Sequence, residues 1–124
     1  MSESKVVEKS NVVIYHNPRC SKSRQTLEII EDKGITPEIK LYLETPPNAD
    51  ELKEVLAQLS LAPRSFMRIK EEEYQANGFD DESLSDDQLI DAMIRFPKLI
   101  ERPVVLCNGK AVIGRPPENV LEII

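Results

Sequence analysis

A chain of 124 residues, 40% of them hydrophobic, suits one domain of ordinary size with a single core. Sixteen basic residues against 22 acidic residues give a net charge of −6, which argues against a nucleic-acid partner because phosphate binding needs a basic face. The two cysteines, Cys20 and Cys107, lie far apart without metal-ligand spacing, so we expect neither a disulfide framework nor a metal site.

The first ten residues are polar and charged, with no apolar run typical of a signal peptide or an anchor. We expect a disordered leader over residues 1–10 and a single domain over residues 11–124. No stretch approaches the roughly 18 apolar residues that a membrane-spanning helix needs. The expectation is a soluble cytoplasmic protein with reduced thiols and no membrane partner.

The first third of the chain predicts a strand, a helix and a second strand. An apolar run predicts a strand over residues 12–15, and helical spacing predicts a helix over residues 21–33 that ends at Gly34. Alternation of polar and apolar side chains predicts a strand over residues 38–43. A strand–helix–strand unit of this kind is typical of α/β folds.

A helical block follows. Asn48 is the expected cap of a helix that ends near Ser60, and a short helical piece is expected over residues 64–69. The charged run 70–73 is expected to be a solvated face or loop without a chemical role. Ser85 and Gln88 have the spacing of a capping box, which predicts a helix that continues to about Phe96.

The last segment predicts two more strands, over residues 103–107 and 111–113, joined by an Asn108-Gly109 hairpin turn. A final helix is expected over residues 118–124. The order therefore indicates an α/β protein with a mixed four-stranded sheet and an inserted helical block, and a thioredoxin-like fold is the simplest arrangement that fits.

Cys20 lies where the first strand passes into the first turn of a helix. Free backbone N–H groups and the positive end of the helix dipole favour a thiolate there, and an anion can use the same groups. Arg19, Lys22 and Arg24 add positive charge, so the pKa of this thiol can fall well below that of a free cysteine. The alternative is a small buried core residue. The polar flanks favour the reactive interpretation.

Three arginines lie next to residues that interrupt regular structure, and a guanidinium suits a tetrahedral oxyanion because several N–H groups meet several oxygens. Arg102 precedes Pro103, Arg115 precedes Pro116, and Arg68 ends the short helical piece. Each alone is ordinarily a surface charge. Their significance depends on convergence at Cys20.

Other polar side chains surround the cysteine. His16 either activates the thiol or only orients the loop, and the sequence supports both roles equally. Asn17 suits an Asx turn, and Ser23, at Cys-x-x-Ser spacing, either projects toward the nucleophile or acts only as a cap. Cys107, flanked by apolar residues in a predicted strand, is interpreted as structural.

Several motifs together resemble the glutaredoxin-coupled arsenate reductase (ArsC) family over residues 12–124. They are His16-Asn17-Pro18-Arg19-Cys20-Ser21-Lys22-Ser23-Arg24, Tyr42-Leu43-Glu44-Thr45-Pro46-Pro47, Leu89-Ile90-Asp91 and Arg102-Pro103. The resemblance implies a thioredoxin-like fold, a cis peptide before Pro103, and Cys20 as the catalytic cysteine. It implies that Arg68, Arg102 and Arg115 bind the oxyanion and that His16, Asn17, Ser23 and Arg24 form the loop around the cysteine.

The resemblance also implies a mechanism in which the Cys20 thiolate attacks arsenate. Glutathione then attacks the adduct, and glutaredoxin reduces the resulting mixed disulfide so that arsenite leaves. No metal or bound organic cofactor is implied. The segment Arg19-Cys20-Ser21-Lys22 is more basic than the usual loop of the family, and the chain ends at Ile124 without the extension that some members carry.

Two other functions fit parts of the pattern. The same cysteine could reduce glutathione mixed disulfides as a general thiol-disulfide reductase. A regulator resembling the Spx branch of the superfamily would instead bind RNA polymerase. That branch commonly carries Cys-x-x-Cys, whereas the second position here is Ser23, so an intrachain redox switch cannot form there.

Overall fold

The computed structural model describes residues 11–124, so the predicted leader over residues 1–10 lies outside the described part. Contacts divide the described chain into two compact units, residues 11–41 with Arg102–Ile124, and Tyr42–Glu101. The expectation of a single domain over residues 11–124 stays a prediction. Within residues 11–124, no helix has the length and apolar character needed to cross a membrane.

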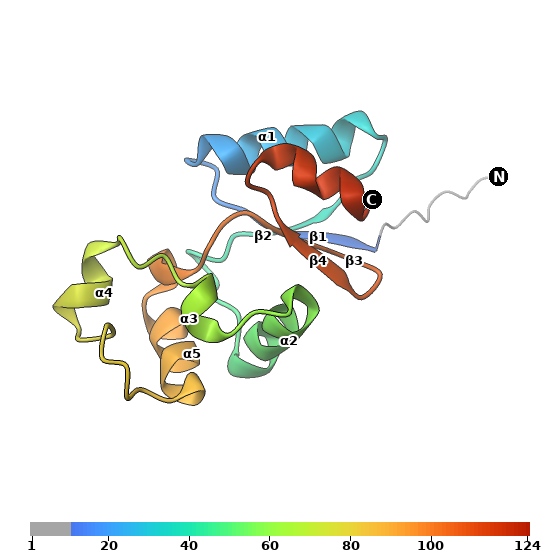
Figure 1. Ribbon diagram of the computed structural model, residues 1–124. Coiled ribbons are helices and arrows are strands. Elements are labelled where there is room, and N and C mark those ends of the chain that lie inside the picture. The colour runs from blue at the N-terminus through green and yellow to red at the C-terminus, as the bar shows by residue number, and fades with distance from the viewer. Residues whose placement is uncertain (1–10) are drawn as a thin grey trace. The chain divides into compact units, whose positions relative to one another are not determined.

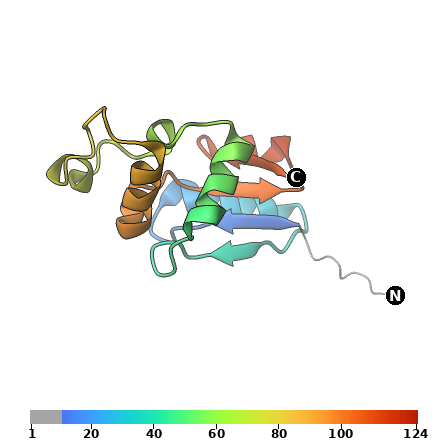
Figure 2. The same ribbon diagram turned by 90° about the horizontal axis from the view of Figure 1, so that it is seen from below.

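The first unit contains a four-stranded mixed sheet in the order β2-β1-β3-β4 (Figures 1 and 2). The strands are β1 (Val12–Tyr15), β2 (Glu38–Lys40), β3 (Val104–Cys107) and β4 (Lys110–Ile113). β1 runs parallel to β2 and antiparallel to β3, and Figure 2 shows the opposite directions of these arrows. The predicted mixed sheet is therefore confirmed.

The connections of the sheet follow local sequence signals. Asn108 and Gly109, with φ of 53° and 81°, make the tight turn between β3 and β4, as the hairpin signal predicts. β2 ends at Lys40, three residues before the predicted end of that strand, because β1 ends at the paired Tyr15 and offers no further partner. Peptide bonds before Pro103 and Pro116 are cis, the first as the family resemblance implies.

One face of the sheet carries the core of this unit. Helix α1 (Ser21–Asp32) and the 3-10 helix η3 (Pro117–Glu122) both lie on this face (Figure 1). η3 replaces the α-helix predicted over residues 118–124, starting at a proline pair that suits a first turn. The buried core residues are Val12, Ile14, Ile30, Val105, Cys107 and Val120.

The second unit is the inserted helical block. Its helices are α2 (Ala49–Leu59), α3 (Pro63–Phe66), α4 (Glu72–Ala76), α5 (Asp86–Arg95) and the 3-10 turn η2 (Pro97–Leu99). The predicted capping box of Ser85 with Gln88 is present, and Asn48 caps α2 as predicted, in a second capping box with Glu51. α2 and α3 pack against α5.

One expectation for this block was wrong. The short helix spans Pro63–Phe66 and not residues 64–69, because proline is favoured in a first helical turn and Met67 already has extended backbone angles. The charged run expected to be a solvated face or loop leads into the first turn of α4, none of its residues is buried, and Tyr74 supplies the buried anchor of this helix.

Candidate active site

Cys20 caps the N-terminus of α1, as predicted, and its side chain is partly exposed. Its backbone N–H donates to Asn17 O at 3.0 Å, which closes the turn between β1 and the helix. Because parallel β1 ends just before this turn, Cys20 lies at the carboxyl edge of the sheet, where α/β folds place their ligands. A sulfur at this position is reachable by a substrate.

The surroundings of the sulfur stabilise its anion. Burial raises the pKa of the Cys20 thiol, but hydrogen bonds from the Ser23 and Lys22 backbone N–H groups and the hydrogen bond and charge of Arg102 outweigh it. The net effect lowers the pKa below the ordinary value of a cysteine thiol. The helix N-terminus therefore favours a thiolate, as the sequence predicts.

Two of the three predicted arginines meet at this sulfur. Arg115 Nη2 lies 3.7 Å from Cys20 Sγ, and Arg115 Nε donates to Arg102 O at 2.7 Å. Arg102 is half-buried, whereas Arg115 is exposed. Guanidinium groups from two ends of the β3–β4 segment thus flank one nucleophile, in an arrangement suited to a tetrahedral anion.

Arg68 lies in the second unit and is held by carboxylates. Arg68 Nη1 is 2.8 Å from Glu101 Oε1, and Nε is 3.3 Å from Glu71 Oε2. Glu71 belongs to the charged run for which no chemical role was expected, and its ion pair with Arg68 leaves that expectation a prediction. A role of Arg68 in oxyanion binding stays a prediction.

A buried hydrogen-bond network shapes the loop before Cys20. Ser23 Oγ accepts from the Asn17 backbone N–H at 3.0 Å and lies 2.6 Å from His16 Nδ1. Asn17 Oδ1 in turn accepts from the Arg19 N–H at 3.0 Å, which is the predicted Asx turn. Arg24 Nη1 donates to Pro18 O at 2.9 Å and ties the helix to the same loop.

Ser23 and His16 therefore act on the loop. The Ser23 hydroxyl contacts His16 and Asn17, whereas the backbone N–H of Ser23 is one of the groups that lower the Cys20 pKa. Burial and the charge of Arg24 lower the pKa of His16, although Glu31 opposes them. A neutral His16 ring that accepts a hydrogen bond from the Ser23 hydroxyl at Nδ1 fits both the short contact and the lowered pKa. This favours the role in which His16 only orients the loop.

Charge is distributed unevenly between the two units. In the described residues the first unit has eight Lys and Arg against six Asp and Glu, whereas the second has six against 14. The net acidity of the chain thus coexists with a slightly basic first unit, in which Arg102 and Arg115 lie beside Cys20. Positive charge beside this sulfur favours the approach of an anion.

The fold and the site agree with a known family. The model of the ArsC family matches residues 15–123, which include the cysteine loop, the inserted block, Arg102 and Arg115. The chain belongs to the ArsC family. Its sheet order and helical insertion are those of the thioredoxin-like fold of this family.

ArsC relatives from several bacteria resemble this chain over most of its length. An arsenate reductase of Neisseria meningitidis is 48% identical over 110 residues, covering 88% of this chain and 94% of that protein. YfgD of Escherichia coli K12 is 54% identical over 114 residues, covering 91% and 96%. The structure of an arsenate reductase from Vibrio cholerae superposes with a TM-score of 0.90 at 56% identity, covering 93% and 98%.

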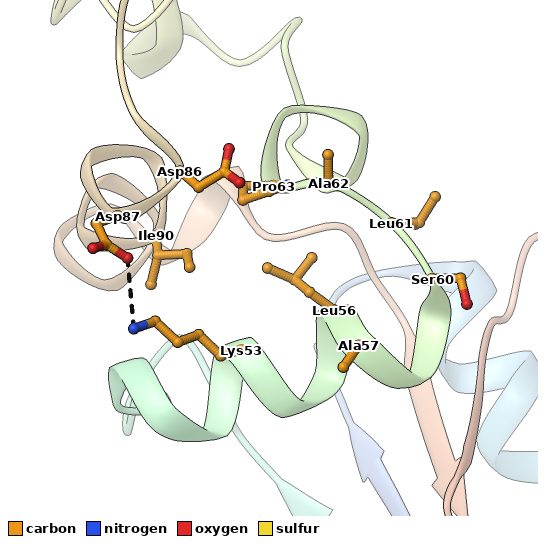
Figure 3. A pocket seen from close by; sticks show the side chains of 10 residues that line it. All are labelled: Lys53, Leu56, Ala57, Ser60, Leu61, Ala62, Pro63, Asp86, Asp87 and Ile90. Carbon is orange, nitrogen blue, oxygen red and sulfur yellow. Dashed lines mark ion pairs between the residues drawn. The ribbon is translucent and has the colours of Figure 1, made fainter.

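The second ArsC unit contains a pocket of about 410 Å³ (Figure 3). Lys53 Nζ and Asp87 Oδ1 lie 3.5 Å apart at its edge. Its remaining walls are mostly small or apolar side chains, namely Leu56, Ala57, Leu61, Ala62, Pro63 and Ile90. None of the predicted site residues lines this pocket.

Two residues next to the ArsC cysteine loop were not predicted from the sequence. Thr26, fully buried in α1, donates to Lys22 O at 2.8 Å and lies 3.5 Å from Gly114 O. Gly114 directly precedes Arg115, and its N–H donates to Pro103 O at 2.9 Å. A glycine beside a candidate anion-binding arginine is a signal that could have pointed to Gly114. Its close packing against Thr26, 88 residues away, cannot be inferred from one sequence.

Among residues 11–124 no group of three or more His, Cys, Asp or Glu side chains is placed to hold a metal ion. Cys107 lies at the far end of β3 from Pro103, paired with Val12, while Cys20 follows the opposite end of β1. Cys107 is buried in the core of its unit, which agrees with a structural role.

Proposed function

We propose that this protein reduces arsenate to arsenite through the Cys20 thiolate, with glutathione and glutaredoxin as the source of electrons. The observation that carries the proposal is the position of Arg115 Nη2, 3.7 Å from a sulfur whose pKa is lowered at a helix N-terminus. The names of relatives 44–48% identical to this chain, all called arsenate reductases, support the choice of arsenate.

Cys20 is the nucleophile of this proposal. Its sulfur attacks arsenic, an oxygen leaves as water or hydroxide, and a sulfur–arsenic bond forms. Arg102 and Arg115 stabilise the negative charge on the arsenate oxygens, together with the backbone N–H groups at the start of α1. By the motif match, Arg68 is the third oxyanion-binding arginine.

Glutathione completes the reduction. Its thiol reacts with the adduct, arsenic(V) gains two electrons and leaves as arsenite, and the sulfurs of Cys20 and glutathione each lose one electron to form a mixed disulfide. Glutaredoxin then takes the glutathione and returns Cys20 to the thiol. An external thiol is needed because Ser23, and not a second cysteine, lies three residues after Cys20. The scheme uses no metal or bound organic cofactor.

The remaining loop residues hold the nucleophile in place. His16, Asn17 and Ser23 fix the turn through their buried hydrogen bonds, Arg24 ties it to α1, and Pro103 brings Arg102 to the start of β3. Preorganisation of this kind lowers the cost of reaching a charged transition state.

The proposal is tested by NADPH-coupled turnover with arsenate, glutathione, glutaredoxin and glutathione reductase. We expect turnover by the wild-type chain and by Cys107→Ala, and none by Cys20→Ser. Absence of wild-type turnover, or full turnover by Cys20→Ser, would overturn it. Turnover of a glutathione mixed disulfide without turnover of arsenate would select the thiol-disulfide reductase function instead.

A further inference from the structure

Gly114 lies at a point where three segments of the first unit meet. It follows β4, its N–H donates to Pro103 O at 2.9 Å, and its carbonyl lies 3.5 Å from Thr26 Oγ1. It is buried, whereas Arg115, the next residue, is exposed. The end of β4 is therefore fastened to the start of β3 and to the first turns of α1.

The space at Gly114 admits no side chain. A Cβ there would lie 2.5 Å from Thr26 Oγ1, 2.8 Å from Pro103 Cγ and 3.1 Å from Thr26 Cγ2. Non-bonded carbon atoms prefer about 3.5–4.0 Å, so all three contacts would be overlaps. The φ angle of Gly114 lies outside the left-handed region, in contrast to Gly34, Gly78 and Gly109. Close packing, and not backbone conformation, is thus the reason for glycine at this position.

Neither neighbour can move aside cheaply. Thr26 is fully buried, its χ1 is restricted by branching at Cβ, and its hydroxyl is fixed by the bond to Lys22 O at 2.8 Å. Pro103 is a buried ring at the start of β3. An added methyl group would therefore push the end of β4, with Arg115, away from α1 and Cys20.

We propose that the contact of Gly114 with Thr26 positions Arg115, by setting how closely its guanidinium approaches Cys20. The backbone carbonyls on either side of Gly114 are also held, because Asn119 Nδ2 donates to Ile113 O at 3.3 Å and to Arg115 O at 3.2 Å. Gly114 and Thr26 are positioning residues and touch no reacting atom. The inference rests on the proposed function only for its consequence in oxyanion binding.

The test compares alkylation of Cys20 by anionic iodoacetate and by neutral iodoacetamide, followed by mass spectrometry of the Cys20 peptide. Both reagents react with the same thiolate, so the fraction of thiolate cancels in the ratio of the iodoacetate rate to the iodoacetamide rate. This ratio rises with positive charge beside the sulfur. We expect Gly114→Ala to lower this ratio by about fivefold, toward the ratio of Arg115→Met, as expected when one positive charge leaves a site near solvent.

Two further variants separate positioning from general damage. Gly34→Ala strains the end of α1, where φ is 79° and no atom lies within 4 Å of a Cβ, so it is a destabilising control that should keep the wild-type ratio. Thr26→Ala removes the side-chain atoms that face Gly114 without adding bulk, and it should lower the ratio less than Gly114→Ala. In the double variant the fall should be smaller than in Gly114→Ala alone, since two of the three overlaps vanish.

A wild-type ratio in Gly114→Ala, or an equal fall in Gly34→Ala, would overturn the inference. If Gly114→Ala fails to fold, a wild-type ratio in Thr26→Ala would overturn it in the same way. The ratio needs no arsenate, so failure of the proposed reductase activity is recognised separately, by a wild-type chain with a high ratio and no arsenate turnover.

Discussion

Arg115 and Cys20, 95 residues apart in sequence, come together with Nη2 3.7 Å from Sγ. The same guanidinium donates through Nε to Arg102 O at 2.7 Å, so its orientation is fixed by the neighbouring segment. A fork held in this way offers N–H groups to an anion that approaches the sulfur. The approach of these two residues is the feature on which the proposed chemistry depends.

Replacing Arg115 by lysine should reduce arsenate kcat/KM about tenfold to a hundredfold, the effect of losing a hydrogen bond to a charged group. Lysine keeps the charge but loses the planar fork and the Nε bond to Arg102 O. Steady-state kinetics with arsenate measure the change, and Lys110→Met, which removes a positive charge from β4, is the control. Wild-type kcat/KM in Arg115→Lys would contradict the role given to the fork.

Replacing Arg102 by methionine should raise the pKa of Cys20, because the hydrogen bond and charge of Arg102 both lower it. Iodoacetamide alkylation followed against pH in a Cys107→Ser background should show a wild-type midpoint below the 8.5 or so of a free thiol. The midpoint should move to higher pH in Arg102→Met, so less thiolate is present at neutral pH. Arg95→Met serves as a charge-matched control. An unshifted midpoint in Arg102→Met would exclude this cause.

His16 is the only histidine of the chain, so its ring titration can be followed by NMR without ambiguity. Burial and the charge of Arg24 lower its pKa below 6.5. The unfolded chain then takes up a proton that the folded chain resists, and the free energy of unfolding should fall as pH drops below 6.5. Arg24→Gln should raise the His16 pKa and reduce this loss, whereas Arg19→Gln should leave both unchanged. A His16 pKa above 6.5 would be evidence against a neutral, orienting ring.

Glu101→Gln should lower the arsenate KM about twofold to fivefold, because it removes one of the carboxylates that hold Arg68 and so frees the guanidinium to bind arsenate. The effect is small because the ion pair is only partly buried. Arg68→Met should have the opposite effect. Glu73→Gln, which loses an ion pair with Lys98 at 3.7 Å, is the matched control. If neither Glu101→Gln nor Arg68→Met changes the arsenate KM, Arg68 is a structural residue of the second unit.

Local signals in the sequence sufficed for most of the fold. Capping residues Asn48 and Ser85, the Asn108-Gly109 turn and the strand before Cys20 each act within a few residues, so they are legible without a structure. The length of β2 and the 3-10 character of η3 could not be predicted from the sequence, since partner strands and tertiary packing determine them.

Only part of the candidate active site could be predicted from the sequence. The loop from His16 to Arg24 is contiguous, so its chemistry could be inferred from neighbouring residue types. The approach of Arg115 to Cys20, the Glu101 partner of Arg68 and the Gly114–Thr26 contact join distant segments. Such contacts depend on packing, which composition and spacing do not encode.

The most direct test of the central claim is intact-mass spectrometry of the chain after incubation with arsenate and reduced glutathione, without glutaredoxin. We expect one glutathione bound to Cys20, formed only when arsenate is present, retained in Cys107→Ala and absent from Cys20→Ser. A chain that gains no glutathione, or that gains it equally without arsenate, would contradict the claim that the Cys20 thiolate attacks arsenate.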